Sequence, residues 1–310
     1  MNGMRVNSAQ THFPFLLPAK LLLGILAICP IFEASQHSRG YATEIFLFQD
    51  EESFFADPPA SLRKDLNSTL AYLRVDDVCL GGYEGMSSQS AYCAYNAGHT
   101  ACLYNKIDGT ACGTVYARKV TAAEQTEILD AHNAKRRRVA KGDETIGSQP
   151  GAQNMRKLTW DSEAASIAQL MVDQCKYEHD RVRNTIKGSV IYNGQNLFAS
   201  WGSSLSTTSS WTAAVDAWYS EVKDWSSANI NPYKFASATG HYTQVVWATT
   251  ERVGCGAIVY QAPGSSSYTK LYACNYAPAG NWEGSAMYIQ GTACNQCPAT
   301  TTCVMDSLCG

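Results

Sequence analysis

Hydrophobic positions after residue 120 follow a helical period in three successive segments. The first segment reads TAAEQTEILDAHNAKRRRVAKG. Thr121 precedes Glu124 by three residues, which is the spacing of a capping box, and Gly142 supplies a stop signal. The pattern predicts a helix between these signals.

The second segment, WDSEAASIAQLMVDQCKYEHD, predicts another helix. Asp161 is placed to cap it, and apolar residues repeat at spacings of three and four, at Ala164, Ile167, Ala168, Met171 and Cys175. His179 is expected at the C-terminal end of this helix, where the helix dipole favours a charged imidazole.

The third segment, SSWTAAVDAWYSEVKDW, has the clearest amphipathic stripe, formed by Trp211, Ala214, Val215, Trp218, Tyr219, Val222 and Trp225. At about 100° per residue, Glu221 falls at the margin of that stripe. A carboxylate there could face a cleft, and the alternative is an ordinary solvated acid at the helix boundary.

After Gly240 the apolar period shifts towards two. The runs VGCGAIVY and KLYACNY are rich in β-branched and aromatic residues and are joined by the loop QAPGSSSYT. They predict a hairpin. Helices followed by strands indicate an α/β (α+β) fold in which helices cover a sheet.

An apolar run, LLLGILAICPIF, lies near the N-terminus behind Arg5 and Lys20. It has about a dozen residues, whereas a membrane-spanning helix needs about 20. We therefore expect residues 1–34 to be a signal peptide cut near Ala34, with an uncleaved anchor as the alternative. The expected mature protein is extracellular and has no stable membrane anchor.

Composition supports export. The 310 residues include 12 cysteines, 45% are apolar, 16% are charged and the net charge is −3. A nucleic-acid partner is disfavoured because phosphate binding needs a clustered basic excess. So many cysteines are typical of an oxidising compartment. Loss of Cys29 with the signal would leave an odd number, so that one thiol stays unpaired within the chain or pairs with another chain.

Two cysteine-bearing segments flank the periodic region. Residues 35–111 predict a loop-rich extension with a glycosylation sequon at Asn67, and residues 293–310 predict a compact disulfide-rich tail. Zinc is the alternative for each group of four cysteines. It is disfavoured in the extension, which lacks a C-x-x-C pair, and in the tail by the export signal.

Two longer motifs carry a family resemblance. GHYTQVVWATT at 240–250 and LYACNYAPAGNW at 271–282 resemble the signature segments of the CAP superfamily, which comprises cysteine-rich secretory proteins, antigen 5 and pathogenesis-related class 1 proteins. AHNAKRR, CKYEHD, GQNLFAS and WYSEVKDW occur in the family's order. The style is most similar to venom-allergen-like and Ancylostoma-secreted-protein-like proteins of nematodes. The resemblance implies a three-layer α-β-α sandwich, disulfide-stabilised, over residues 112–292.

The resemblance also implies a site of two histidines and two acids. Matching each motif places the histidines at His179 and His241 and one acid at Glu221, while Gln195 occupies the position of the other acid. His132 matches a family helix signature and is expected to be structural. The resemblance further suggests Cys175–Cys255 and Cys274–Cys294 disulfides.

Two imidazoles could hold zinc or another divalent metal weakly, and Gln195 is expected to weaken it further because it removes a negative charge. The alternative is a pair of hydrogen-bonded histidines without metal. No P-loop, Rossmann fingerprint, H-E-x-x-H or G-x-S-x-G motif is present.

The favoured function is a secreted, non-enzymatic binding protein that engages an unidentified extracellular protein, with modulation of host immunity as the expectation of a nematode-like member. A sterol or fatty-acid carrier is the first alternative. A metal-dependent hydrolase with Glu221 as general base is the second, and it lacks a third protein ligand for the metal.

Overall fold

The computed structural model describes residues 87–310, which lie within the second of the two compact units into which the chain divides, Thr69–Gly310. The expected signal peptide, the sequon at Asn67, Cys29 and Cys79 lie outside the described residues.

A five-stranded sheet forms the middle of the fold. Its main path runs β1-β4-β5-β3, and β2 pairs with β4 outside that path. The strands are β1 (Thr114–Arg118), β2 (Thr159–Trp160), β3 (Gly194–Gly202), β4 (Arg252–Gln261) and β5 (Tyr268–Ala277). β4 and β5 are antiparallel neighbours, which confirms the predicted hairpin.

The three predicted helices are present in the predicted order, the first with the predicted caps at Thr121 and Gly142, and a further helix, α10 (Gly240–Val245), was not predicted. The predicted helices are α7 (Ala122–Lys141), α8 (Ser162–Val172) and α9 (Trp211–Tyr219). Short 3-10 turns are η2 (Ile146–Ser148), η3 (Ser220–Asp224) and η4 (Ser227–Asn229). The capping box of α7 is confirmed, since Thr121 Oγ1 accepts from the Glu124 amide and a Glu124 carboxylate oxygen accepts from the Thr121 amide.

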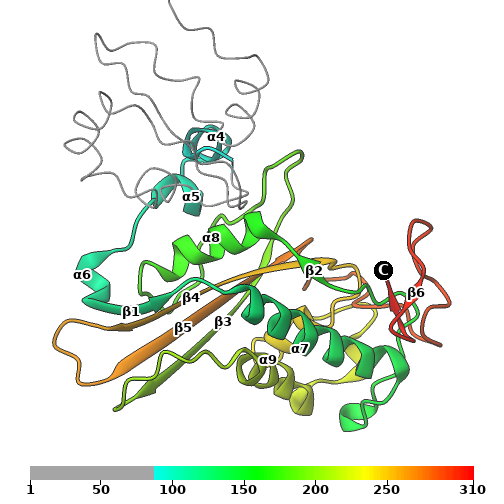
Figure 1. Ribbon diagram of the computed structural model, residues 1–310. Helices are drawn as coiled ribbons and strands as arrows, with labels where there is room; N and C mark the ends of the chain where they lie inside the picture. Colours follow the sequence, from blue (N-terminus) through cyan, green and yellow to red (C-terminus); the bar gives the residue numbers. More distant parts are fainter. Residues whose placement is uncertain (1–86) are drawn as a thin grey trace, which may run out of the picture. The chain divides into compact units, whose positions relative to one another are not determined.

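The sheet lies between two helical layers, with α8 on one face and α7 and α9 on the other (Figure 1). Two glycines of β4 let α8 approach closely. A Cβ at Gly254 would lie 2.2 Å from the backbone nitrogen of Ala165, and one at Gly256 would lie 2.5 Å from that of Gln169. Glycine is required where two backbones come this close. The three-layer sandwich implied by the resemblance is confirmed.

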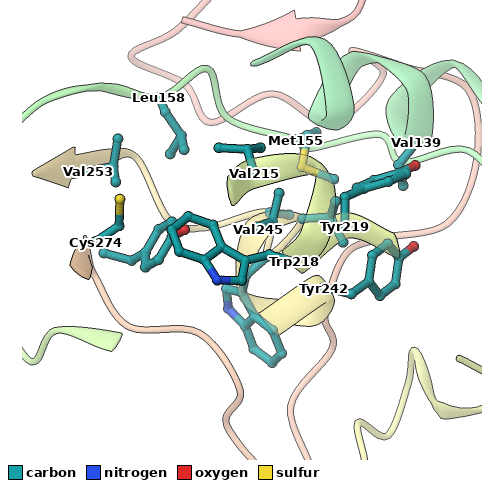
Figure 2. Close-up of a cluster of buried hydrophobic side chains, with 14 of the residues drawn as sticks. Val139, Met155, Leu158, Val215, Trp218, Tyr219, Tyr242, Val245, Val253 and Cys274 are labelled. Carbon is teal, nitrogen blue, oxygen red and sulfur yellow. The ribbon is translucent and has the colours of Figure 1, made fainter. Parts of the chain in front are cut away.

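The apolar stripe of α9 packs into the main hydrophobic core on the α7 side of the sheet. Figure 2 shows Val215, Trp218 and Tyr219 beside side chains from other elements, including Val245 of α10 and Cys274 of β5. Trp218 is 2% exposed, and its indole nitrogen donates to the carbonyl of Leu197 on β3, at 2.8 Å. The core thereby fixes η3, which carries Glu221, next to the sheet.

The second helix is shorter than predicted. It ends at Val172, and Cys175 has a left-handed backbone with φ of 54°, so the chain leaves the helix before His179. Cys175 fitted the helical pattern because it is apolar and partly buried. Its burial comes from the disulfide to Cys112 and not from a position on the packed face of a helix. The placement of His179 at a helix end was wrong.

The disulfide partners differ from those implied by the resemblance. Cys175 pairs with Cys112 and Cys255 pairs with Cys274. Cys255 and Cys274 are directly opposite each other on β4 and β5, with Cα atoms 4.1 Å apart, so neither is free to bind Cys175 or Cys294. The remaining pairs are Cys93–Cys102, Cys294–Cys303 and Cys297–Cys309.

Of the extension predicted to be loop-rich, residues 35–111, the structure describes residues 87–111, which contain short helices and pack onto the domain. The helices are α4 (Gln89–Tyr95), α5 (Thr100–Leu103) and α6 (Gly109–Cys112). Tyr92 is fully buried in a cluster with residues of α8, and its hydroxyl donates to the buried Glu163 carboxylate at 2.6 Å.

The C-terminal tail also packs against the domain. Its hairpin consists of β6 (Cys303–Val304) and β7 (Leu308–Cys309). The backbone of Cys309 donates to Met155 and accepts from Lys157, and Leu308 is fully buried. Within residues 87–310, no helix combines the length and the hydrophobicity needed to cross a bilayer.

Candidate functional site

Glu221 fixes the orientation of His241. His241 lies in the first turn of α10, and its Nδ1 is 2.7 Å from Glu221 Oε1. Glu221 Oε2 accepts from the backbone nitrogens of His241, at 2.9 Å, and Tyr242, at 3.1 Å. The carboxylate is an acceptor only, so Nδ1 of a neutral ring carries the hydrogen and Nε2 keeps its lone pair.

Gln195 does the same for His179. The Oε1 atom of Gln195, at the start of β3, lies 2.7 Å from His179 Nδ1. Its Nε2 donates to Asp180 Oδ1 and to Asn275 Oδ1, both at 2.9 Å. Asn275 is itself oriented, because its Nδ2 donates to the carbonyl of Ala164. Both amide hydrogens of Gln195 are therefore used, and its oxygen faces His179.

The pKa of His179 is lowered, chiefly because the surrounding protein removes part of the ring's solvation. The hydrogen bond that His179 donates to Gln195 and the charge of Asp180 act in the opposite direction, and the positive charges of Arg183 and His241 lower the pKa further. The side chain is nevertheless exposed to a ligand. The environment favours a neutral imidazole, which is the form that binds metals, and not the charged ring expected at a helix end.

Consecutive residues of β3 reach the two histidine segments. While Gln195 binds the His179 ring, the side-chain nitrogen of Asn196 donates to the backbone oxygen of His241 at 3.1 Å. The four residues predicted from the resemblance are thus brought together, and we call His179, Gln195, Glu221 and His241 the two-histidine site. Each histidine presents Nε2 because an acceptor holds its Nδ1.

His132 lies apart from this site and is structural, as predicted. It is fully buried in α7, its Nδ1 lies 2.7 Å from the carbonyl of Ile128, and its Nε2 lies 2.8 Å from the hydroxyl of Tyr276. Both ring nitrogens are used inside the protein, so none is left for a ligand.

Three sulfurs in the tail form a second group with metal-ligand spacing. The Sγ atoms of Cys294, Cys297 and Cys309 lie within 4.8 Å of one another. All three belong to disulfides, with Cys303 as the fourth partner. A metal binds the thiolate, so this group can hold an ion only after reduction.

Two open hollows lie elsewhere on the described surface. One of about 400 Å³ is lined by residues 103–110 and Gln174. Another, of about 430 Å³, lies against the C-terminal hairpin and includes Arg156, Lys157 and Arg252. Neither is lined by a residue of the two-histidine site.

Sequence reasoning missed Asp180 and Asn275, which orient Gln195. Asp180 directly follows His179, and Asn275 directly follows Cys274 within a quoted motif. Their positions next to residues of the motifs were the only signal in the sequence. Their contacts with Gln195 span 15 and 80 residues and could not be predicted from it.

The three-layer fold and the paired histidines are features of one class of protein, and comparison of the sequence with known proteins identifies that class. The profile of the cysteine-rich secretory protein family, CAP, matches residues 129–276. The chain is 44% identical over 218 residues to venom allergen 5 of Microctonus hyperodae, covering 65% of this chain and 91% of that protein. The chain belongs to the CAP family, as its motifs indicated.

Other relatives share the same domain. CRISP/Allergen/PR-1 of Trittame loki is 39% identical over 71% of this chain, which spans about half (53%) of that longer protein. Among solved structures, BmVAL-1 is similar with a TM-score of 0.51 and 25% identity, over 61% of this chain and 95% of BmVAL-1. The chain is thus similar to venom allergens and venom-allergen-like proteins.

Proposed function

We propose that this protein is a secreted, non-enzymatic binding protein whose two-histidine site binds a divalent metal weakly. One observation carries the metal proposal: His179 and His241 each have Nδ1 held by an acceptor, which leaves both Nε2 lone pairs for a ligand. Acceptors that bind the other ring nitrogen orient metal-binding histidines and raise their basicity.

The donor set fits zinc or a similar ion held by two imidazoles. A bound ion would supply a Lewis-acidic centre whose other positions remain open to water or to a ligand. Glu221 carries the negative charge nearest to His241, and its side chain is 21% exposed. Two protein ligands make a weak site, consistent with a role in recognition.

The hydrogen bonds of Glu221 favour a non-enzymatic role. Both of its oxygens accept bonds from the ring or backbone of His241 and Tyr242. A general base must instead accept a proton from a reacting water, and Gln195 has no titratable group. The hydrolase alternative is therefore the weaker proposal.

Secretion is supported by the disulfides, which use all ten cysteines of residues 87–310 and are stable in oxidising compartments. The partner in this proposal is an extracellular protein, with host immune modulation as the expected outcome of binding. Carriage of a sterol or fatty acid remains the alternative, and it would require a lipid stoichiometry that the protein-partner proposal does not.

Calorimetric titration of zinc into the full secreted chain tests the metal proposal. We expect saturable binding that is lost in both His179→Ala and His241→Ala. Glu178→Gln is the matched control, because Glu178 is exposed and adjacent to His179 but carries no charge the proposal needs. Unchanged zinc affinity in both histidine variants would refute the site.

A further inference from the structure

Asp180 is a buried carboxylate behind the two-histidine site, and three elements converge on it. Its side chain is 8% exposed. Oδ1 accepts from Arg183 Nε at 2.6 Å and from Gln195 Nε2 at 2.9 Å, while Oδ2 accepts from the hydroxyl of Thr100. None of these contacts was expected from the motifs.

We propose that Asp180 is a positioning residue for the two-histidine site, holding the Gln195 amide so that its oxygen faces His179 Nδ1. The proposal rests on the proposed function. It extends the chain of hydrogen bonds by one member, so that Thr100 holds Asp180, Asp180 holds Gln195 and Gln195 holds His179.

The orientation of the Gln195 amide follows from this chain. If the amide were reversed, its oxygen would face the oxygens of Asp180 and Asn275, and its nitrogen would face His179 Nδ1. The Gln195 oxygen would then face the Asp180 and Asn275 oxygens, and none of the three can donate a hydrogen. Hydrogen bonds would be lost in a partly buried position, which is unfavourable. Asp180 and Asn275 thus exclude the reversed amide, and His179 keeps its hydrogen on Nδ1 and its lone pair on Nε2.

A glutamate at position 195 would not suit these surroundings. Its carboxylate would replace the amide nitrogen that now lies 2.9 Å from Asp180 Oδ1, bringing two negative charges together. Gln195 and Asp180 therefore form a matched donor and acceptor, and the Asp180 charge is paired with Arg183 Nε at 2.6 Å. The sequence alone suggested that Gln195 weakens metal binding because it lacks a charge, whereas its contacts give Gln195 the role of orienting His179.

The N-terminal segment anchors this pair. Thr100 is 1% exposed, and its backbone nitrogen donates to the carbonyl of Val182 at 2.9 Å. The neighbouring His99 is fully buried, caps α5 by accepting from Ala101 at Nδ1, and lies 2.8 Å from the Asn184 carbonyl at Nε2. The segment that precedes the family match thus reaches the loop that carries His179.

A charge-exchange cycle in the full chain tests the proposal. Wild type, Asp180→Asn, Gln195→Glu and the double variant Asp180→Asn/Gln195→Glu are compared by zinc calorimetry, and by 15N NMR of the His179 ring without metal. Asp180→Asn should weaken zinc binding by about 10-fold, the lower end of the usual effect of such partners. Gln195→Glu alone should bring no gain, and the double variant should recover at least wild-type affinity.

Ring 15N shifts separate this proposal from the proposed function. Zinc-free wild type should show His179 with its hydrogen on Nδ1, and Asp180→Asn should increase the fraction with hydrogen on Nε2. If that holds but zinc does not bind, the positioning stands and the metal function fails. Wild-type affinity and tautomer in Asp180→Asn, or a double variant no better than Asp180→Asn, would overturn the positioning role.

Thr100→Val provides a second, milder perturbation. It removes one donor to Asp180 while keeping shape, so zinc affinity should fall by about 2- to 5-fold, as expected for one lost hydrogen bond. Thr126→Val, on the exposed surface of α7, is the matched control. Equal zinc affinities in these two variants would show that Thr100 does not help to position Asp180.

Discussion

Glu221 binds His241 twice, through the ring nitrogen at 2.7 Å and through the backbone nitrogen at 2.9 Å. The same carboxylate therefore selects the histidine tautomer and satisfies the first turn of α10. The hydrogen bonds that orient the ring for the proposed metal therefore also stabilise the start of α10.

We predict that Glu221→Ala lowers the free energy of unfolding by about 1–3 kcal/mol, since backbone donors of α10 lose their acceptor. Zinc affinity should fall as well. Glu221→Gln should keep more stability than Glu221→Ala, because its amide oxygen can still accept. Denaturant unfolding and calorimetry of the two variants measure both effects, and equal stability of wild type and Glu221→Ala would contradict the prediction.

Acid should destabilise the protein through His132. Burial lowers the pKa of His132 to about 4, and the charge of Arg136 acts in the same direction, whereas the hydrogen bond with Ile128 opposes it. In the unfolded chain the pKa is about 6.5, so acidification protonates the unfolded state first. This contribution to stability is complete above about pH 6.5 and is lost as the pH falls towards 4.

The size of the pH effect follows from the fall of the His132 pKa from 6.5 to about 4, which corresponds to about 3 kcal/mol at most. Urea unfolding at several pH values between 7 and 4 should show it. His132→Gln, which does not titrate, is the comparison. The prediction fails if that variant loses stability with acid as steeply as wild type does.

The packing of α8 on β4 should make Gly254 intolerant of any side chain. In Gly254→Ala the added carbon would lie 2.2 Å from Asp161 O and Ala165 N, so a whole helix would have to move. We expect a loss of more than about 3 kcal/mol or failure to fold. Gly202→Ala is the control, with its nearest neighbour at 3.6 Å, and it should change stability by less than about 1 kcal/mol. Comparable melting temperatures for the two variants would argue against this packing.

The cysteine count predicts one free thiol in a mature chain. Ten of the 12 cysteines form disulfides, which leaves Cys29 and Cys79. If the predicted signal is removed near Ala34, Cys79 has no partner within the chain. Thiol titration of the denatured secreted protein should give one group per chain, or none if Cys79 links two chains. Peptide mass spectrometry separates these results, and a Cys29–Cys79 peptide would disprove the cleavage.

Local signals predicted the helices α7, α8 and α9 and the hairpin because each depends on residues that are neighbours in the sequence, whereas α10 was not predicted. The capping box at Thr121 and the stripe of α9 are examples. The length of α8 was overestimated because a disulfide buries Cys175, and hydrophobic periodicity does not distinguish this from helix packing. The disulfide partners were predicted wrongly for a related reason. Cys255 and Cys274 lie opposite each other only because of the register between β4 and β5.

The four site residues were predictable only through their family motifs, because they come from a loop, a strand, a 3-10 turn and a helix far apart in the sequence. Asp180 was not predictable from those motifs. Its role depends on a hydroxyl 80 residues earlier and an amide 15 residues later. Such a contact becomes visible only when the chain is folded.

The Cys112–Cys175 disulfide closes a loop across 63 positions that contains both α7 and α8. In a chain-entropy description, a closure of this length stabilises the fold by about 4 kcal/mol. It also joins the end of the N-terminal segment to the stretch that leads to His179. Reduction of this one bond would remove the covalent cross-link between the segments that carry Thr100 and His179, and would leave hydrogen bonds such as those of Thr100 to Val182 and Asp180 to connect them.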